Sequence, residues 1–248
     1  MEQSDPNLNT TDTMSGRTAL FRAAANGHEE VVRVLLERND VNPNVVDEYN
    51  RTPLSMAAEN GHEEVVRILL ERNINPNAGD EEGRTPLLWA AWNGHEEVVR
   101  ILLEWGVNPN ASDEEGRTPL SWAARYGHEE VVRILLEQNG INPNIANLRG
   151  RTPLSWAARN GHEEVVRILL EQNDINPNIA NSRGRTPLSM AAETGRGGIV
   201  WILLERDDVN LDTIDQFGKT PVSWATECGH GGIAKLLRDR ADFVLGSI

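Results

Sequence analysis

Hydrophobic residues recur along the chain in paired clusters that polar stretches separate. In one copy, residues 54–58 carry apolar side chains at helical spacing directly after Thr52 and Pro53, a threonine N-cap followed by a proline at the first helical position. Gly61 follows, as glycine does just past a last helical turn. The run 65–70 then covers a wide apolar face. The pattern predicts a short helix that ends near Gly61 and a second helix that starts directly after it.

Polar residues complete this unit. Glu63 and Glu64 fall in the first turn of the second helix, where the helix dipole favours acids. Glu63 also precedes Arg67 by four residues, so we expect these two side chains to pair along the helix. Residues 73–83 are rich in Asn, Pro and Gly, as a turn requires. At the equivalent turn position of the preceding unit, Asn50 replaces Gly and is expected to adopt a left-handed backbone.

The whole pattern repeats. The string R-T-P-L or a close variant starts at seven places spaced by 33 or 34 residues, and G-H-E-E-V-V-R or a degenerate form follows ten positions later. These starts are Arg17, Arg51, Arg84, Arg117, Arg151, Arg185 and Lys219. No single unit can bury its apolar faces alone, so each must stack on its neighbours.

The pattern D-x-x-G-R-T-P-L-x-x-A-A-x-x-G-H-x-x-V-V-x-x-L-L-E, met almost in full by residues 80–104 and 113–137, resembles the ankyrin repeat. The nearly identical second helices also resemble arrays of filamentous fungi. The resemblance implies one all-α domain, an ankyrin-repeat solenoid of seven stacked helix–turn–helix units joined by hairpin-like turns. The expected repeats are 17–50, 51–83, 84–116, 117–150, 151–184, 185–218 and 219–240, between a polar N-terminal segment, 1–16, and a C-terminal tail, 241–248.

The chain departs from the family pattern at one framework position. Ankyrin units usually carry His after T-P-L, and here Ser55 and its equivalents occupy most of these places. We therefore expect the imidazole hydrogen bonds that brace adjacent hairpins to be missing, and the serine hydroxyl to cap its own helix instead. The atypical end units and the initial Met argue for a complete, capped array.

Composition narrows the classes of partner. A formal net charge of −14 disfavours nucleic acid and anionic membrane surfaces. The single cysteine, Cys228, allows no internal disulfide, and because the N-terminus is polar with no apolar run, we expect no signal peptide there. No apolar stretch approaches the roughly 20 residues needed to cross a bilayer. We expect a monomer in the cytoplasm and leave a nuclear location open.

Candidate chemistry is sparse. The six histidines share one repeat position, from His28 to His230, and stacked layers on the order of 10 Å apart cannot bring them to one metal ion. Cys228 has no oriented base or oxyanion site near it in sequence. We predict no catalytic residue, no cofactor and no metal. The tryptophans of the W-A-A strings share a position with methionines, so we expect them to pack in the core.

The resemblance implies where a partner binds, because turn tips and first-helix ends line a concave groove in this family. These positions vary between units whose second helices are nearly copies. Trp92 and Tyr126 fall in adjacent repeats and are the large aromatics expected to anchor a partner. At these groove positions, acidic residues come first along the chain and arginines follow. The predicted partner-binding residues are Tyr49, Glu59, Glu81, Glu82, Trp92, Asn93, Glu114, Glu115, Arg125, Tyr126, Arg149, Arg159 and Arg183.

These residues favour a protein-interaction module whose partner carries a basic segment. Two other functions stay open at this point. The chain could be the recognition part of a larger signalling or immune-type receptor, against which its Met start and capped ends argue. It could instead bind a small molecule through Trp92 and Tyr126.

Overall fold

The computed structural model describes residues 8–13, 15–72 and 74–246. Within these ranges it contains fourteen helices and no strand, so the predicted all-α class is confirmed. The chain divides into two compact units, Met1–Glu114 and Glu115–Ile248. The predicted N-terminal segment, 1–16, lies partly outside the described residues.

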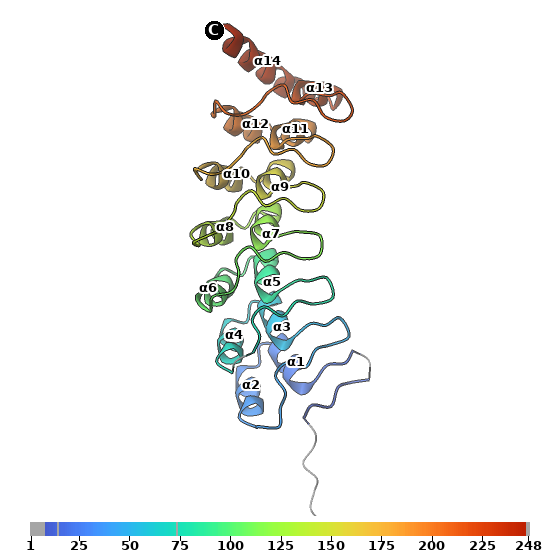
Figure 1. Cartoon of the computed structure of the whole chain (residues 1–248), viewed down its shortest axis with the longest axis vertical. Helices are drawn as coiled ribbons and strands as arrows, with labels where there is room; N and C mark the ends of the chain where they lie inside the picture. Colours follow the sequence, from blue (N-terminus) through green and yellow to red (C-terminus); the bar gives the residue numbers. More distant parts are fainter. Residues whose placement is uncertain (1–7, 14, 73, 247–248) are drawn as a thin grey trace, which may run out of the picture. The chain divides into compact units, whose positions relative to one another are not determined.

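The described part of the first unit holds three helical hairpins. Their bounds are α1 (Ala19–Ala25) with α2 (Glu29–Leu36), α3 (Pro53–Glu59) with α4 (Glu63–Leu70), and α5 (Pro86–Asn93) with α6 (Glu96–Glu104). The first helices α1, α3 and α5 pack against one another in order, and α2, α4 and α6 form a second row beside them (Figure 1). Each hairpin therefore contacts its neighbours along both rows.

The second unit repeats this arrangement with four hairpins among the described residues. They are α7 (Pro119–Tyr126) with α8 (Glu129–Leu136), α9 (Pro153–Asn160) with α10 (Glu163–Leu170), α11 (Pro187–Glu193) with α12 (Gly197–Leu204), and α13 (Pro221–Glu227) with α14 (Gly231–Gly246). Within this unit, α7, α9, α11 and α13 form one row and α8, α10, α12 and α14 the other. The last helix continues into the segment 241–248 that the sequence assigned to a tail, and residues 247–248 lie outside the described ranges.

Local capping explains why such short first helices form. The Thr52 hydroxyl oxygen accepts from the backbone N–H of Ser55 at 3.0 Å, and the Ser55 hydroxyl oxygen accepts from the N–H of Thr52 at 2.9 Å. This reciprocal capping box satisfies two of the N–H groups that a helix start leaves unpaired. Thr118 and Ser121 repeat it in α7. The expectation that serine caps its own helix is confirmed.

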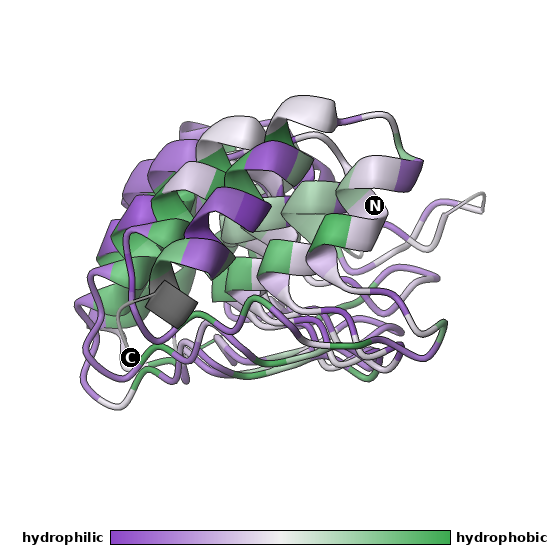
Figure 2. Ribbon diagram, turned by 90° about the horizontal axis from the view of Figure 1, so that it is seen from above, coloured by the Kyte–Doolittle hydropathy of each residue, from purple (hydrophilic) through white to green (hydrophobic). Residues whose placement is uncertain are grey.

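The core lies between and within the two rows. Ala57, Ala58 and Val66 are fully buried, and so are their equivalents in the inner repeats. Small alanines let successive first helices approach closely, while Val, Ile and Leu of the second helices fill the remaining space. Figure 2 shows the hydrophobic residues as bands within the helices and hydrophilic residues along much of the turns.

Ion pairs on the second helices run between hairpins, so the predicted pairing of Arg67 with Glu63 is wrong. The Arg67 guanidinium donates to Glu97 of the next hairpin at 2.6 Å, and in the second unit Arg133 donates to Glu164 at 2.7 Å. Stacking of neighbouring second helices brings the glutamate of the next hairpin within reach of the arginine. Such half-exposed pairs contribute little individually.

Imidazoles do brace adjacent hairpins, which corrects the expectation that these bonds are missing. They come from the histidine that follows the turn glycine, at His62, His95, His162 and His230. His62 Nε2 lies 3.1 Å from the carbonyl oxygen of Ala25, and His162 Nε2 lies 3.0 Å from that of Arg125. Since a carbonyl oxygen only accepts, Nε2 carries the proton and donates. The family histidine after T-P-L is thus not needed for a link between hairpins.

The extended turns are joined to one another by backbone hydrogen bonds. In the first unit, the N–H of Glu81 donates to the carbonyl oxygen of Tyr49 at 3.1 Å, and the N–H of Glu114 donates to that of Glu82 at 2.9 Å. Asn50 has a φ of 60°, which confirms the left-handed conformation expected there. Side chains at the turn tips are therefore held in register within each unit.

Candidate functional site

The predicted partner-binding residues fall into one set in each unit. Those of the first unit form what we call the acidic surface: Tyr49, Glu59, Glu81, Glu82, Trp92, Asn93 and Glu114. Those of the second unit form the arginine surface: Glu115, Arg125, Tyr126, Arg149, Arg159 and Arg183. Trp92 and Tyr126 thus belong to different units.

The tips of the acidic surface project into solvent. Glu81, Glu82 and Glu114 are exposed, and the Tyr49 side chain is 49% exposed with the Arg51 guanidinium 4.9 Å from its ring centroid. The Glu82 carboxylate pairs with Arg84 at 2.6 Å. Acidic side chains at adjacent tips create a negative potential that attracts a cationic segment.

Glu59 lies deeper and has an unusual environment. Its Oε2 atom is buried and has no hydrogen-bond partner. Burial raises the pKa of the Glu59 carboxyl, against the lowering effect of the nearby Arg51 and Arg84 guanidiniums. Arg51 donates instead to Asp47, at 2.7 Å from Nη2 to Oδ2. At the equivalent place in the second unit, Glu193 accepts from Arg185 at 2.7 Å, so Glu59 differs from its counterpart in having a free acceptor.

The aromatic residues of the acidic surface form a stack. The rings of Trp89 and Trp92 are 5.2 Å apart and nearly parallel, and the Arg84 guanidinium lies 4.4 Å from the Trp89 ring centroid. Trp89 is buried, as predicted for a packing residue, but its Nε1 donor has no acceptor. Trp92 is half-buried above it, and Asn93 donates to the carbonyl oxygen of Trp89 at 3.0 Å.

On the arginine surface, cations are stacked on tryptophan. The guanidiniums of Arg125 and Arg151 lie 4.4 Å and 4.5 Å from the ring centroid of Trp156. Tyr126 is 42% exposed and stacks on Trp122 at 5.9 Å. Contact with an aromatic face is favourable for a cation, so Trp156 stabilises each of these two guanidiniums.

The arginine surface differs from the acidic surface at one turn position, where Asn147 stands in place of an aspartate. Asp80 Oδ1 accepts a hydrogen bond from the backbone N–H of Arg84, and Asp80 Oδ2 accepts one from Arg84 Nε at 2.8 Å. Asp47 accepts the same two hydrogen bonds from Arg51. Asn147 keeps the first contact, accepting from the N–H of Arg151 at 2.9 Å, but its amide nitrogen cannot accept from the guanidinium. Sequence reasoning did not single out Arg151 or Asn147, although the change from Asp to Asn at a repeat position was visible.

A concavity of about 340 Å³ lies on the arginine surface. It is lined by Glu115, Arg117, Arg125, Asn147, Arg149, Arg151 and Trp156. Burial, together with the positive charges of Arg159, Arg149, Arg125 and Arg183, lowers the pKa of the Arg151 guanidinium. The surface therefore concentrates positive charge in a partly enclosed space.

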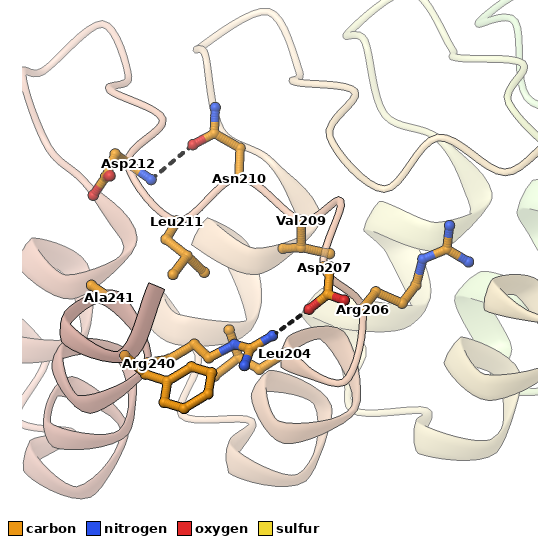
Figure 3. Close-up of a pocket in the computed structure, with 10 residues that line it drawn as sticks. Leu204, Arg206, Asp207, Val209, Asn210, Leu211, Asp212, Arg240 and Ala241 are labelled. Atoms are coloured by element: carbon orange, nitrogen blue, oxygen red, sulfur yellow. Dashed lines mark hydrogen bonds and ion pairs between the residues drawn. The ribbon is translucent and has the colours of Figure 1, made fainter. Parts of the chain in front are cut away.

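A second concavity, of about 470 Å³, lies away from every predicted residue, at the last two hairpins. Figure 3 shows Val209 and Leu211 on one side of it and Arg240 on the other, with an ion pair from Arg240 to Asp207 at 2.8 Å. Its walls combine aliphatic side chains with this pair. It offers neither a nucleophile with an adjacent base nor a set of metal ligands.

Among the described residues, no group of three or more His, Cys, Asp or Glu side chains could hold a metal ion. The part of the chain that the structure describes also contains no helix that is both long and apolar enough to cross a membrane.

Comparisons with known proteins agree with the hairpin architecture. A family model described as ankyrin repeats (3 copies) matches residues 1–80, 40–113, 74–147, 106–181, 139–215 and 174–245. A crystal structure of the human ASB11 ankyrin repeat domain is similar to the chain, with a TM-score of 0.79 and 28% sequence identity over 90% of this chain and 98% of that one. A comparison with curated protein sequences gave no match.

Proposed function

The chain belongs to the ankyrin-repeat family, whose repeats are generally protein–protein interaction modules, and we propose that it binds a partner protein through the turn tips and first-helix ends of its repeats. Folds of this family are typically non-catalytic binding scaffolds, and we propose no catalytic role for any residue. The single Cys228 fits a reducing compartment such as the cytoplasm. We propose that the free protein is a monomer.

The observation that carries this proposal is the segregation of charge on the variable positions. The acidic surface has exposed carboxylates at successive tips, and the arginine surface has exposed or half-buried guanidiniums at the same register positions. The second helices of these units are nearly identical, so the framework does not require the difference. A partner with a basic segment complements the first surface, and an acidic group complements the second.

Unpaired polar atoms support the assignment of the acidic surface. Glu59 Oε2 and Trp89 Nε1 are a buried acceptor and a buried donor without partners. Buried polar groups in proteins are nearly always hydrogen-bonded, and an unpaired one costs about 1–3 kcal/mol. A Lys or Arg side chain of a partner would pair with the half-exposed Glu59 carboxylate. The half-buried Trp92, which is stacked on Trp89, provides an apolar anchor.

The test compares single variants within each unit. Trp92→Ala on the acidic surface and Tyr126→Ala on the arginine surface each remove an aromatic anchor, and such truncations commonly cost about 2 kcal/mol or more. We expect at least a tenfold loss of affinity for proteins captured from a native lysate, with far-UV circular dichroism unchanged. Glu81→Lys reverses a charge on the acidic surface and should also weaken binding.

The control variant is Glu96→Lys, which makes the same charge change at an exposed position where α6 begins, in the row of second helices. We expect it to keep its partners. If Glu96→Lys releases the captured proteins while Trp92→Ala, Tyr126→Ala and Glu81→Lys retain them, then the binding surface proposed for this protein is wrong.

A further inference from the structure

Five guanidiniums of the second unit have no carboxylate to neutralise them. Arg125, Arg149, Arg151, Arg159 and Arg183 lie within one unit, and no Asp or Glu among the described residues is within ion-pairing distance of any of them. The counterparts of Arg151 in the first unit are paired, because Arg51 and Arg84 each hold a buried aspartate. Unpaired arginines at one place in an acidic protein are a specific local feature rather than a consequence of overall charge.

The turn residue Asn147 deprives Arg151 of the carboxylate partner that Arg51 and Arg84 have within their own turns. It occupies the position of Asp47 and Asp80, and it keeps the two backbone contacts of the turn, accepting from the N–H groups of Arg149 at 3.0 Å and Arg151 at 2.9 Å. Asn therefore supports the same two backbone hydrogen bonds of the turn as Asp does. The difference is the missing negative charge, which an aspartate would have supplied at no structural cost.

Geometry then brings these cations to one place. Arg117, Arg125, Arg149 and Arg151 line the concavity of about 340 Å³, and two of them are stacked on Trp156. Glu115 also lines it and lies 3.9 Å from Arg117. The lining thus holds more guanidiniums than carboxylates. Mutual repulsion and burial both disfavour this arrangement, in agreement with the lowered pKa of Arg151.

We infer that this concavity binds the phosphoryl group of a phosphorylated segment in a partner protein, with Arg125, Arg149 and Arg151 as the donors. A phosphoryl group carries a charge of about −1.5 to −2 and three acceptor oxygens, and guanidiniums bind it bidentately. One carboxylate would neutralise a smaller part of the charge. Arg159 and Arg183 continue the positive surface beside the concavity and would receive acidic side chains that flank the phosphorylated residue.

This inference rests on the proposed function, since it names the partner chemistry of the arginine surface. Nucleic acid is the other phosphate-bearing partner. The net charge of −14 repels a long polyanion, whereas a single phosphoryl group within reach of a local positive site is attracted at short range.

The sharpest test uses Asn147→Asp. This change installs the residue that the chain already uses at four equivalent turns, namely Asp47, Asp80, Asp113 and Asp215, so folding is preserved, and it supplies Arg151 with a carboxylate partner. The probe is the peptide acetyl-Gly-Glu-pSer-Glu-Gly-amide, where pSer is phosphoserine, with versions in which Ser or Glu replaces the phosphoserine. Binding is measured from the ¹⁵N–¹H signals of arginine side chains in the full chain.

We expect the phosphopeptide to bind at least tenfold more tightly than either replacement, and to shift the signals of Arg125, Arg149 and Arg151. Asn147→Asp and Arg149→Gln should each weaken it at least tenfold. Arg133→Gln removes the same charge from α8 and should change binding by less than threefold. Equal binding of the three peptides, or undiminished binding to Asn147→Asp, would overturn the inference.

A companion measurement separates this inference from the proposed function. Proteins captured from lysate by the parent chain are treated with a phosphatase and offered to it again. Release after treatment, together with failure to bind Asn147→Asp, is the expected result. The opposite result would be partners that bind equally well after phosphatase treatment and still lose binding in the Trp92→Ala or Tyr126→Ala variant. That result would support the protein-interaction function and would rule out the phosphoryl site.

Discussion

His95 Nε2 donates to the main-chain carbonyl oxygen of Glu59 at 2.9 Å, so a side chain of one hairpin satisfies the end of the first helix in the hairpin before it. The imidazole occupies the space directly beside the turn glycine of that earlier hairpin. A Cβ on Gly61 would lie 2.6 Å from His95 Nδ1. Glycine is thus required at position 61 for two reasons: the backbone is left-handed there, and the absence of a Cβ leaves space for the His95 imidazole.

The first prediction compares two glycines of similar backbone. Gly61→Ala forces a left-handed residue, at about 1–2 kcal/mol, and also displaces His95, with loss of a hydrogen bond worth about 1 kcal/mol. Gly106 has a φ of 71°, and a Cβ at this position would have no other atom within 4 Å, so Gly106→Ala incurs only the backbone cost. Urea denaturation should find Gly61→Ala the less stable by about 1 kcal/mol. Equal midpoints would show that His95 gives way freely.

The second prediction concerns the buried carboxylate of Asp47. Burial raises its pKa, but the hydrogen bonds from the Arg51 side chain and from the N–H groups of Arg51 and Tyr49 prevail and lower it. Its stabilisation is therefore present at neutral pH and is lost as pH falls below the ordinary value of 3.8. Asp47→Asn should cost about 1.5–3 kcal/mol at pH 7, and less near pH 3.

The matched control for Asp47→Asn is Asp40→Asn, at an exposed aspartate that pairs with Arg38 at 3.0 Å. Exposed pairs contribute little because solvent screens them, so this variant should be close to the parent at both pH values. Chemical denaturation at pH 7 and pH 3 supplies the comparison. An equal loss from both variants would mean that burial of Asp47 adds nothing to its ion pair.

The third prediction concerns Glu59, whose contribution to stability depends on pH in the opposite direction to that of Asp47. Burial raises the pKa of Glu59, so the folded state holds this proton more tightly than the unfolded chain does. The stabilisation is present below the ordinary value of 4.5 and is lost as pH rises through the folded pKa, above which ionised Glu59 opposes folding. Glu59→Gln should therefore raise Tm at pH 7, by about 1–2 °C for a group partly screened by solvent.

That gain should shrink when the melting curves are repeated at pH 4. The same variant should bind the partner of the acidic surface less tightly, because an amide cannot replace the carboxylate toward a cation. A residue that lowers stability while it supports binding is typical of a functional site. If Glu59→Gln melts below the parent at pH 7, the carboxylate is a structural group and its assignment to the surface fails.

The fourth prediction is indifference to metal. Four histidines of this repeat position already direct Nε2 at carbonyl oxygens of the preceding hairpin: His62, His95, His162 and His230. Removal of divalent ions by a chelator should leave Tm unchanged within error. A structural zinc ion contributes folding free energy outright, so a fall of several degrees would revive a metal site.

The fifth prediction tests the dependence on stacking. Residues 51–114 hold only two hairpins, with helices of seven to nine residues that are too short to persist alone in water. This fragment should be largely unfolded by circular dichroism. The first unit, residues 1–114, holds three hairpins and should fold. A sharp cooperative melt of 51–114 would contradict stabilisation by neighbouring repeats.

Much of this protein follows from its sequence because the repeat supplies many copies of each local signal. Thr52 and Pro53 start a helix by capping and by a preset φ, and α3 begins and ends within two residues of the predicted places. Asn50 adopts the left-handed turn for the same local reason. These outcomes depend on residues that are near one another along the chain, so sequence alone determined them, together with the family.

The tertiary structure decided which side chains meet. Arg67 could pair with Glu63 of its own helix or with Glu97 of the next, and only packing of α4 on α6 selects Glu97. The convergence of Arg125 with Arg149 and Arg151 likewise needs two stacked layers, and so does the unpaired burial of Glu59. Sequence placed these residues on one surface by register. Distance and burial depend on the stack, because residues some 30 positions apart in sequence become neighbours only when hairpins pack.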